Sequence, residues 1–113
     1  MLWVCIRMKF IFLLIGHAFA DFVFQSGDMS KGKNRHRLTD LPPGQKRQAV
    51  WVYFLTAHAL VHGFMVYLVT GSVVFMVCET LLHWSIDFGK CENWYGIHED
   101  QAMHILCKLI WII

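Results

Sequence analysis

Long apolar runs make up most of this chain, and one polar stretch interrupts them. The apolar runs cover about residues 2–25, 49–69, 71–88 and 98–113, and the polar stretch covers residues 26–48. The run "AVWVYFLTAHALVHGFMVYLV" at 49–69 contains no Lys, Arg, Asp or Glu. As a helix it would reach about 32 Å, enough to cross a hydrocarbon core of ~30 Å. The apolar part of the fourth run, "DQAMHILCKLIWII" at 100–113, would reach only about 21 Å, so we expect it to be tilted into the bundle or to cover part of the bilayer.

The connections between these runs predict how they pack. Thr70 and Gly71 alone separate the second run from the third, and so short a connection favours an antiparallel helical hairpin. Trp51 and Tyr53 lie near the start of the second run, where aromatic side chains meet the membrane–water interface. The pattern predicts a single membrane domain over residues 1–113, an all-α polytopic four-helix bundle.

The polar stretch at 26–48 is basic and is predicted to be a loop. It holds six Lys or Arg residues and two Asp residues, together with the turn signal "LPPGQ". An excess of Lys and Arg in a short loop favours the cytoplasmic side. We therefore expect an integral protein of a bacterial inner membrane, or of a host membrane if a phage encodes it, with this loop in the cytoplasm.

That orientation leaves the first residues outside, although Arg7 and Lys9 favour the inside. Either the first helix begins tilted or at the interface, or "FIFLLIG" is the apolar region of a signal peptide cut after Ala20. The cut would separate His17 from Asp21, and the apolar "DFVFQ" continues past it. Both interpretations stay open at this point.

Composition supports a membrane protein. It argues against a nucleic-acid-binding protein and against one stabilised by disulfides or a zinc–thiolate site. Hydrophobic residues make up 57% and charged residues 16%, whereas soluble domains average about half and about a quarter. The net charge of +2 is too small to indicate a nucleic-acid partner. The four cysteines form no C-x-x-C motif and mostly lie in apolar runs, where Cys is a small hydrophobe. We therefore expect neither a disulfide framework nor a zinc–thiolate site.

Each apolar run carries ionisable residues four positions apart. The pairs are His17 and Asp21, His58 and His62, His83 and Asp87, and Asp100 and His104. Residues at this spacing share one face of a helix, about 5–6 Å apart at Cβ. A charged side chain near the bilayer centre costs about 2.5–3.5 kcal/mol, so several facing lipid would exceed the ~5–15 kcal/mol stability of a domain. The four polar faces are predicted to meet in one inward-facing His/Asp cluster.

A divalent metal explains this combination of residue types. Neutral imidazole and carboxylate bind zinc, the ion we favour, and also Fe, Mn, Co or Ni. Helical bundles build such centres from side chains on facing helices. The predicted metal ligands are His17, Asp21, His58, His62, His83, Asp87 and His104. Gln25, Glu79 and Gln101 are expected to orient those ligands through hydrogen bonds.

The same residues permit two other interpretations. A single His in a membrane helix is usually a hydrogen-bonding group between helices, and proton-relay networks use the same residue types. Lys108 shares the face of the fourth pair and is either a salt-bridge partner or a side chain that extends to the interface. His36 and His98 fall in predicted loops and are expected to be solvated.

Membrane lipid is the expected partner, with no nucleic acid, and a homo-oligomer is compatible with the pattern. The candidate headgroup-binding residues are Lys31, Lys33, Arg35 and Arg37, because basic juxtamembrane segments attract anionic lipids. The alternative role of these four cations is to fix the topology of the loop.

The ordered set of motifs resembles a known family. "H-x-x-x-D-F-x-x-Q" at 17–25, "H-A-x-x-H" at 58–62, "H-x-x-x-D" at 83–87 and "D-Q-x-x-H" at 100–104 resemble, in this order, small bacterial and phage membrane proteins grouped as the domain of unknown function numbered 3307. The resemblance spans nearly the whole chain and implies no activity. The pattern is also similar in style to membrane-bound metal-dependent hydrolases, which place His and Asp in short apolar helices.

We expect a metal-dependent membrane hydrolase that acts on a lipid or on an amphiphile with a phosphate group. Asp21, Asp87 and Asp100 are the candidate catalytic residues, since a carboxylate that does not bind the metal would act as general base. One alternative is a proton or metal-ion conductor, because Glu79, His83 and Asp87 are spread over about 12 Å of helix. Another is a structural or accessory phage membrane protein whose polar core only fixes helix pairing.

Overall fold

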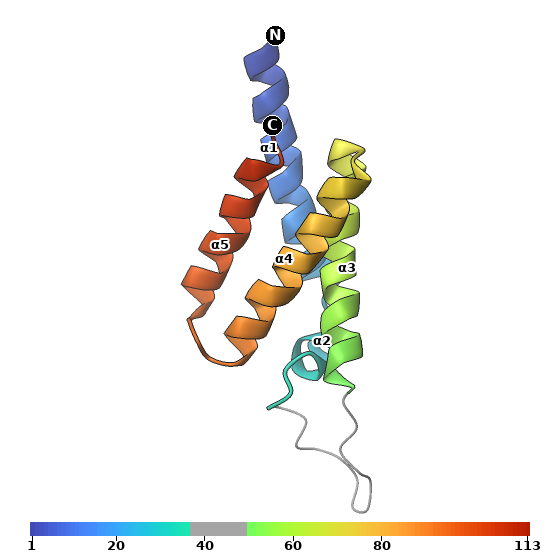
Figure 1. Cartoon of the computed structure of the whole chain (residues 1–113), viewed down its shortest axis with the longest axis vertical. Coiled ribbons are helices and arrows are strands. Elements are labelled where there is room, and N and C mark those ends of the chain that lie inside the picture. The colour runs from blue at the N-terminus through green and yellow to red at the C-terminus, as the bar shows by residue number, and fades with distance from the viewer. Residues whose placement is uncertain (37–49) are drawn as a thin grey trace, which may run out of the picture.

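The computed structural model describes residues 1–36 and 50–113, apart from the side chains of Asp28 and Met29, and every regular element in it is a helix. This confirms the predicted all-α class. The elements are α1 (Leu2–Ala18), the π-helical turn η1 (Phe19–Val23), α2 (Gly27–Gly32), α3 (Trp51–Thr70), α4 (Val73–Cys91) and α5 (Ile97–Ile110). Figure 1 shows α3 and α4 as a hairpin, with α1 and α5 completing the group.

The predicted loop at 26–48 differs from the structure over its first residues, because α2 forms there. Two glycines weaken the helical signal of this segment. Packing against α3 compensates: a Cβ on Gly32 would lie only 2.7 Å from the ring of Phe54, so the backbone of α2 rests directly on that side chain. A tertiary contact of this kind overrides a weak local propensity.

Two helices are long and apolar enough to cross a membrane, judged by length and composition within the described residues. They are Leu2–Val23, which joins α1 and η1, with a mean hydropathy of 1.7, and α3, with 1.6. Four such spans were predicted. The helix α4 carries Glu79, Asp87 and Lys90 among its apolar residues, and α5 has only 14 residues.

The α3–α4 hairpin forms at the predicted short connection. Gly71 adopts a left-handed conformation with φ of 69°, and its N–H donates to the carbonyl of Tyr67 at 2.7 Å. Ser72 begins the next helix by accepting a hydrogen bond from the N–H of Phe75, which is the usual role of an N-cap serine. Gly63 lets the two helices approach closely, because a Cβ there would lie 2.8 Å from the carbonyl oxygen of Met76.

The interior of the protein is more polar than its outer faces. An apolar cluster of Leu13, Val66 and Trp111 packs near the 70–72 turn, but most other fully buried large side chains are His, Lys, Asp or Glu. Large apolar side chains such as Leu81 on α4 point outward. A soluble domain has the opposite arrangement, and the buried polar groups identify the candidate functional region.

Candidate metal centre

Every long helix contributes polar side chains to one buried cluster. The contributors are His17 on α1, Asp21 on η1, His58 and His62 on α3, His83 and Asp87 on α4, and Asp100, Gln101 and His104 on α5. The histidines are each 6% exposed or less. The structure therefore brings all four predicted i, i+4 pairs into one interior region.

Four of these residues are close enough to share one ion. One ligand atom from each of Asp21, His58, His62 and His83 lies within 4.8 Å of the others. His62 Nε2 lies 2.8 Å from Asp21 Oδ1, and His58 Nε2 lies 3.4 Å from the same oxygen. Three imidazole nitrogens and one carboxylate oxygen are a donor set that zinc accepts in tetrahedral geometry.

Unsatisfied ring nitrogens show that this quartet fits a metal ion. Both nitrogens of His83 are buried and have no hydrogen-bond partner among the described residues, and the same holds for Nδ1 of His62. A buried polar atom without a partner costs about 1–3 kcal/mol, so such atoms are uncommon in native proteins. A metal bond to His83 would satisfy one of its nitrogens.

The π-helical turn determines where Asp21 lies. The N–H of Phe24 donates to the carbonyl of Phe19 at 2.9 Å, the i to i+5 pattern that accommodates an extra residue in the turn. Turns of this kind occur often at functional sites. Regular i, i+4 spacing does not predict the turn, and neither glycine nor proline in the segment announces it.

Gln101 and His17 lie beside the quartet. The amide nitrogen of Gln101 donates to Asp21 Oδ2 and to Asp100 Oδ2, both at 3.2 Å. Its amide oxygen lies 3.1 Å from His17 Nε2, and that nitrogen also lies 3.3 Å from Asp21 Oδ2. Gln101 therefore holds the Asp21 carboxylate in place, as a residue that orients a ligand would.

Asp87 is held by a buried lysine. Lys33 Nζ donates to Asp87 Oδ2 at 2.7 Å and to Gln25 Oε1 at 2.6 Å, while Asp87 Oδ2 lies 3.7 Å from His58 Nε2. Lys33 is only 5% exposed, in contrast to the surface position expected of a headgroup-binding loop residue. The sequence could not reveal this, because Lys33 sits among other cations in the polar stretch.

His104 stacks on the quartet from α5. Its ring centroid lies 4.2 Å from that of His83, and its Nε2 lies 3.3 Å from Asp100 Oδ1. His17, Asp87 and His104 were predicted as ligands but lie outside the quartet in the described structure. His17 lies beside Gln101, Asp87 accepts a hydrogen bond from Lys33, and His104 lies beside Asp100, so these three candidates flank the quartet.

Glu79 belongs to a separate buried ion pair. Glu79 Oε1 accepts a hydrogen bond from the Lys108 ammonium. Its other carboxylate oxygen, Oε2, accepts one from the indole N–H of Trp111 at 2.5 Å. His83 Nδ1 lies 3.9 Å from Glu79, so the two regions adjoin. Of the two roles considered for Lys108, the structure shows the salt bridge. Trp111 was not anticipated from the sequence.

The remaining predicted cations lie at the surface or outside the described residues. Arg35 pairs with Glu92, with Nε 2.6 Å from Oε1, and this guanidinium lowers the pKa of Glu92. His36 is exposed and lies 3.1 Å from Glu92 Oε2. Lys31 is exposed, and His98 is exposed on the first turn of α5. Arg37 lies outside the described residues.

A small cavity opens beside the cluster. It has a volume of about 120 Å³ and is lined by residues that include Asp21, Asp87, Asp100 and His104. Since one molecule of liquid water occupies about 30 Å³, the cavity has room for a few waters or for part of a small substrate. Both aspartates that lie outside the quartet face this space.

Comparison with known proteins identifies the family. A family model described as "Protein of unknown function (DUF3307)" matches residues 9–113. No curated protein and no solved structure matches the chain. The match covers nearly the whole chain and confirms the resemblance noted from the four motifs, so this chain belongs to the DUF3307 family.

Proposed function

We propose that this chain is an integral membrane protein with a divalent metal centre, most simply zinc, which hydrolyses a lipid or amphiphilic substrate. The observation that carries the proposal is the quartet of Asp21, His58, His62 and His83, whose ligand atoms lie within 4.8 Å of one another. The two nitrogens of His83 lack hydrogen bonds within the described structure. A metal ion bound by the quartet would give one of these nitrogens the partner that the described residues do not supply.

The distribution of apolar side chains supports a polytopic four-helix bundle in the membrane. Val74 and Leu81 on α4 are 67% and 64% exposed, and Leu106 on α5 is 59% exposed. Six ionisable residues of these helices are buried: Glu79, His83, Asp87, Asp100, His104 and Lys108. Helices with polar faces inward and apolar faces outward suit lipid better than water. In this arrangement α4 and α5 join the two longer apolar helices, and the basic segment after α2 is cytoplasmic.

The chemistry follows from the residues around the quartet. A divalent metal supplies Lewis-acid activation of water and of a scissile carbonyl or phosphoryl group. Asp100 is the best placed general base, because its Oδ1 is buried without a hydrogen bond from the described residues and it faces the 120 Å³ cavity. Asp87 is less suited, since Lys33 occupies one of its oxygens. His104 beside Asp100 would relay the proton.

Elemental analysis tests the metal directly. Protein purified in detergent without added chelator is expected to contain about one zinc per chain. The variant His62→Gln/His83→Gln should lose that metal, whereas His98→Gln, which changes an exposed histidine on the same chain, should retain it. A folded wild-type sample without stoichiometric divalent metal, after incubation with zinc and removal of the excess, would overturn the proposal.

Hydrolysis is tested separately from metal binding. Detergent-solubilised protein loaded with zinc is given amphiphilic phosphate esters and carboxylic esters with a chromogenic leaving group. Asp100→Asn is expected to lower kcat by about 100-fold, in the range for loss of a general base, while metal content stays unchanged. Equal rates for wild type and Asp100→Asn would remove the role of this aspartate.

A proton conductor is the second candidate, and one specific observation favours it. The imidazoles of His62, His83 and His104 form a stacked row, with centroid distances of 3.6 Å and 4.2 Å. A row of this kind leads from Asp21 toward Asp100, and rows of ionisable residues in membrane helices serve as proton relays. Proton flux into liposomes at an imposed potential, absent in His83→Leu, would favour conduction over hydrolysis.

A further inference from the structure

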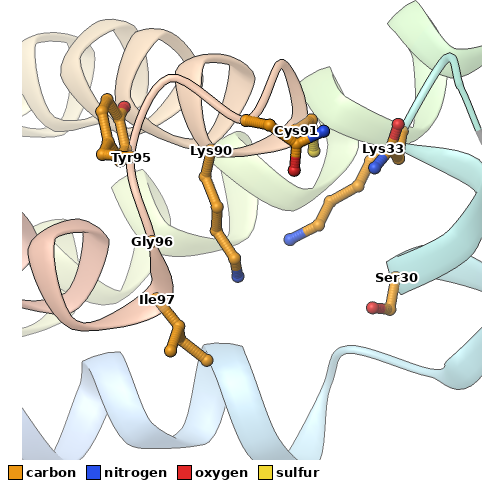
Figure 2. Close-up of a pocket in the computed structure, with 9 residues that line it drawn as sticks. Ser30, Lys33, Lys90, Cys91, Tyr95, Gly96 and Ile97 are labelled. Atoms are coloured by element: carbon orange, nitrogen blue, oxygen red, sulfur yellow. The ribbon is translucent and has the colours of Figure 1, made fainter.

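A second, larger cavity lies on the approach to the cluster. It has a volume of about 280 Å³ and is bounded by the ends of α2, α4 and α5. Its polar lining residues are Ser30, Lys33, Asn34, Lys90 and Asn93. Figure 2 shows the Lys33 and Lys90 side chains directing their ammonium ends into this space. Among the residues that the structure describes, no Asp or Glu lines it.

The two cavities adjoin each other. Lys33, Lys90 and Ile97 line both of them, so the two lysines stand at the boundary. On the inner side, carboxylates face the lysines: Asp87 Oδ2 lies 2.7 Å from Lys33 Nζ, and Asp100 Oδ2 lies 3.9 Å from Lys90 Nζ. The outer side presents hydroxyl and amide groups. Lys90 is the more weakly paired and the more exposed of the two lysines, so its ammonium is the one more available to a ligand in the outer cavity.

We infer that the outer cavity binds the phosphate group of the substrate, using Lys33, Lys90, Asn34 and Asn93. The ammonium groups are Lys90 on α4 and Lys33 just after α2, and Lys33 keeps one N–H beyond its bonds to Asp87 and Gln25. Together with two side-chain amides they suit a tetrahedral polyanion with three terminal oxygens. A carboxylate offers only two oxygens in one plane. This deepens the proposed function, on which it rests for the reaction, by assigning the substrate to the phosphate-bearing class.

The position of the cavity suits an amphiphile. Tyr95 lines it, and the neighbouring Trp94 is 69% exposed. Aromatic residues of this kind lie at the level of lipid headgroups. The turn that carries them is fixed by Asn93, which has φ of 60°, and by the N–H of Trp94 donating to the carbonyl of Gly89 at 3.1 Å. An acyl chain could then lie along the outer apolar surface while the phosphate enters.

Binding of a phosphate amphiphile tests the inference. Radiolabelled lauroyl lysophosphatidic acid is titrated into full-length protein in dodecyl maltoside, with partition into protein-free micelles subtracted. Lys90→Gln is expected to raise the Kd about tenfold, the range for loss of one charge-assisted hydrogen bond. Arg7→Gln removes an equal charge from an exposed position on α1 outside the cavity and should change the Kd less than twofold.

A second variant guards against a folding defect in the first. Asn34→Asp keeps the oxygen that accepts the backbone N–H of His36 at 2.9 Å but adds a negative charge to the cavity. It is also expected to weaken binding about tenfold. Equal affinities for wild type, Lys90→Gln and Asn34→Asp, or equal losses in Lys90→Gln and Arg7→Gln, would overturn the inference.

Two further measurements complete the test. One distinguishes a free phosphate from a lipid headgroup, and the other tests the phosphate site independently of the metal centre. Competition by millimolar inorganic phosphate would identify a free phosphate site, and its absence would identify a lipid headgroup site; either result with the Lys90 dependence supports the inference. Binding is measured in chelator-treated and zinc-loaded samples. Lys90-dependent binding in protein that takes up no zinc would overturn the metal centre alone, and zinc uptake without Lys90-dependent binding would overturn the phosphate site alone.

Discussion

The protein buries two adjoining polar clusters that differ in how far its own atoms satisfy them. Between α4 and α5, both oxygens of the Glu79 carboxylate have partners, Lys108 and the indole N–H of Trp111. Across η1, α3 and α4, ring nitrogens of His62 and His83 have none within the described residues. The cluster whose polar atoms all have partners, the complete cluster, joins two helices. The cluster with unpartnered ring nitrogens, the incomplete cluster, is the one in which we propose a metal. Burial of ionisable residues alone does not distinguish the two.

The largest effect is expected from breaking the complete cluster. Glu79→Ala would leave the Lys108 ammonium buried without its partner, which costs about 3–5 kcal/mol of unfolding free energy. The measurement is the midpoint of unfolding in mixed detergent micelles. The double variant Glu79→Leu/Lys108→Met replaces the pair with apolar side chains and should return to near wild-type stability, with zinc uptake retained. A single variant as stable as the wild type would show that the pair is not structural.

The incomplete cluster should respond to metal instead. Zinc at 100 times its Kd should add about 2.7 kcal/mol to wild-type stability and nothing to His83→Leu, in which one ligand is gone. Without zinc, His83→Leu is expected to be no less stable than the wild type, since it removes two unsatisfied nitrogens. Thermal unfolding with zinc and with chelator measures both effects. A zinc-independent loss of stability in His83→Leu would make this cluster structural as well.

Separating α3 from α4 should affect one cluster more than the other. Gly63→Ala places a Cβ where the Met76 carbonyl oxygen is 2.8 Å away, an overpacking that costs about 1–3 kcal/mol. The quartet spans these two helices and should lose zinc affinity, while the Glu79 pair joins α4 to α5 and should persist. Gly27→Ala is the matched control, because its Cβ meets no atom within 4 Å. Unchanged zinc affinity in Gly63→Ala would argue against this geometry.

A small pH effect is expected outside both clusters. Arg35 lowers the pKa of Glu92 below 4.5 through a hydrogen bond, so this carboxylate holds fewer protons folded than unfolded. Its contribution to stability is present above pH 4.5 and is lost as the pH falls through the lowered pKa. The slope of unfolding midpoint against pH below 4.5 should be shallower in Glu92→Gln. Identical slopes in the two proteins would show that the pair does not contribute.

The sequence predicted the buried His/Asp cluster because its signal is periodic. Residues four positions apart on helices of low charge had to share a face and turn inward, and His58 with His62 on α3 do so. The all-helical class followed from the same apolar runs. The division of the cluster did not, because which imidazole keeps a free nitrogen depends on partners from other helices, such as Gln101 for His17.

Two features were beyond the reach of pattern analysis. In the sequence, Lys33 does not differ from the other cations of the basic stretch. Only the packing of α2 on α3 places its ammonium beside Asp87. The polar cavity brings Lys90 and Asn93, at the turn between α4 and α5, together with Ser30 and Asn34 from a much earlier part of the chain. Both are contacts between elements distant in sequence, which periodicity within one helix does not encode.

The π-helical turn at Phe19–Val23 divides the first apolar helix into two parts under different structural constraints. The outer part is the N-terminal part of α1, and the inner part is the turn itself, which carries Asp21. Leu2, Trp3 and Phe12 are 73%, 74% and 50% exposed, so in the proposed membrane arrangement the thickness of the bilayer would be the main constraint on the outer part. The inner part holds a carboxylate to tolerances set by imidazoles on other helices. Under that proposal, variation in the outer part would adapt the protein to membranes of different lipid content without moving the Asp21 carboxylate.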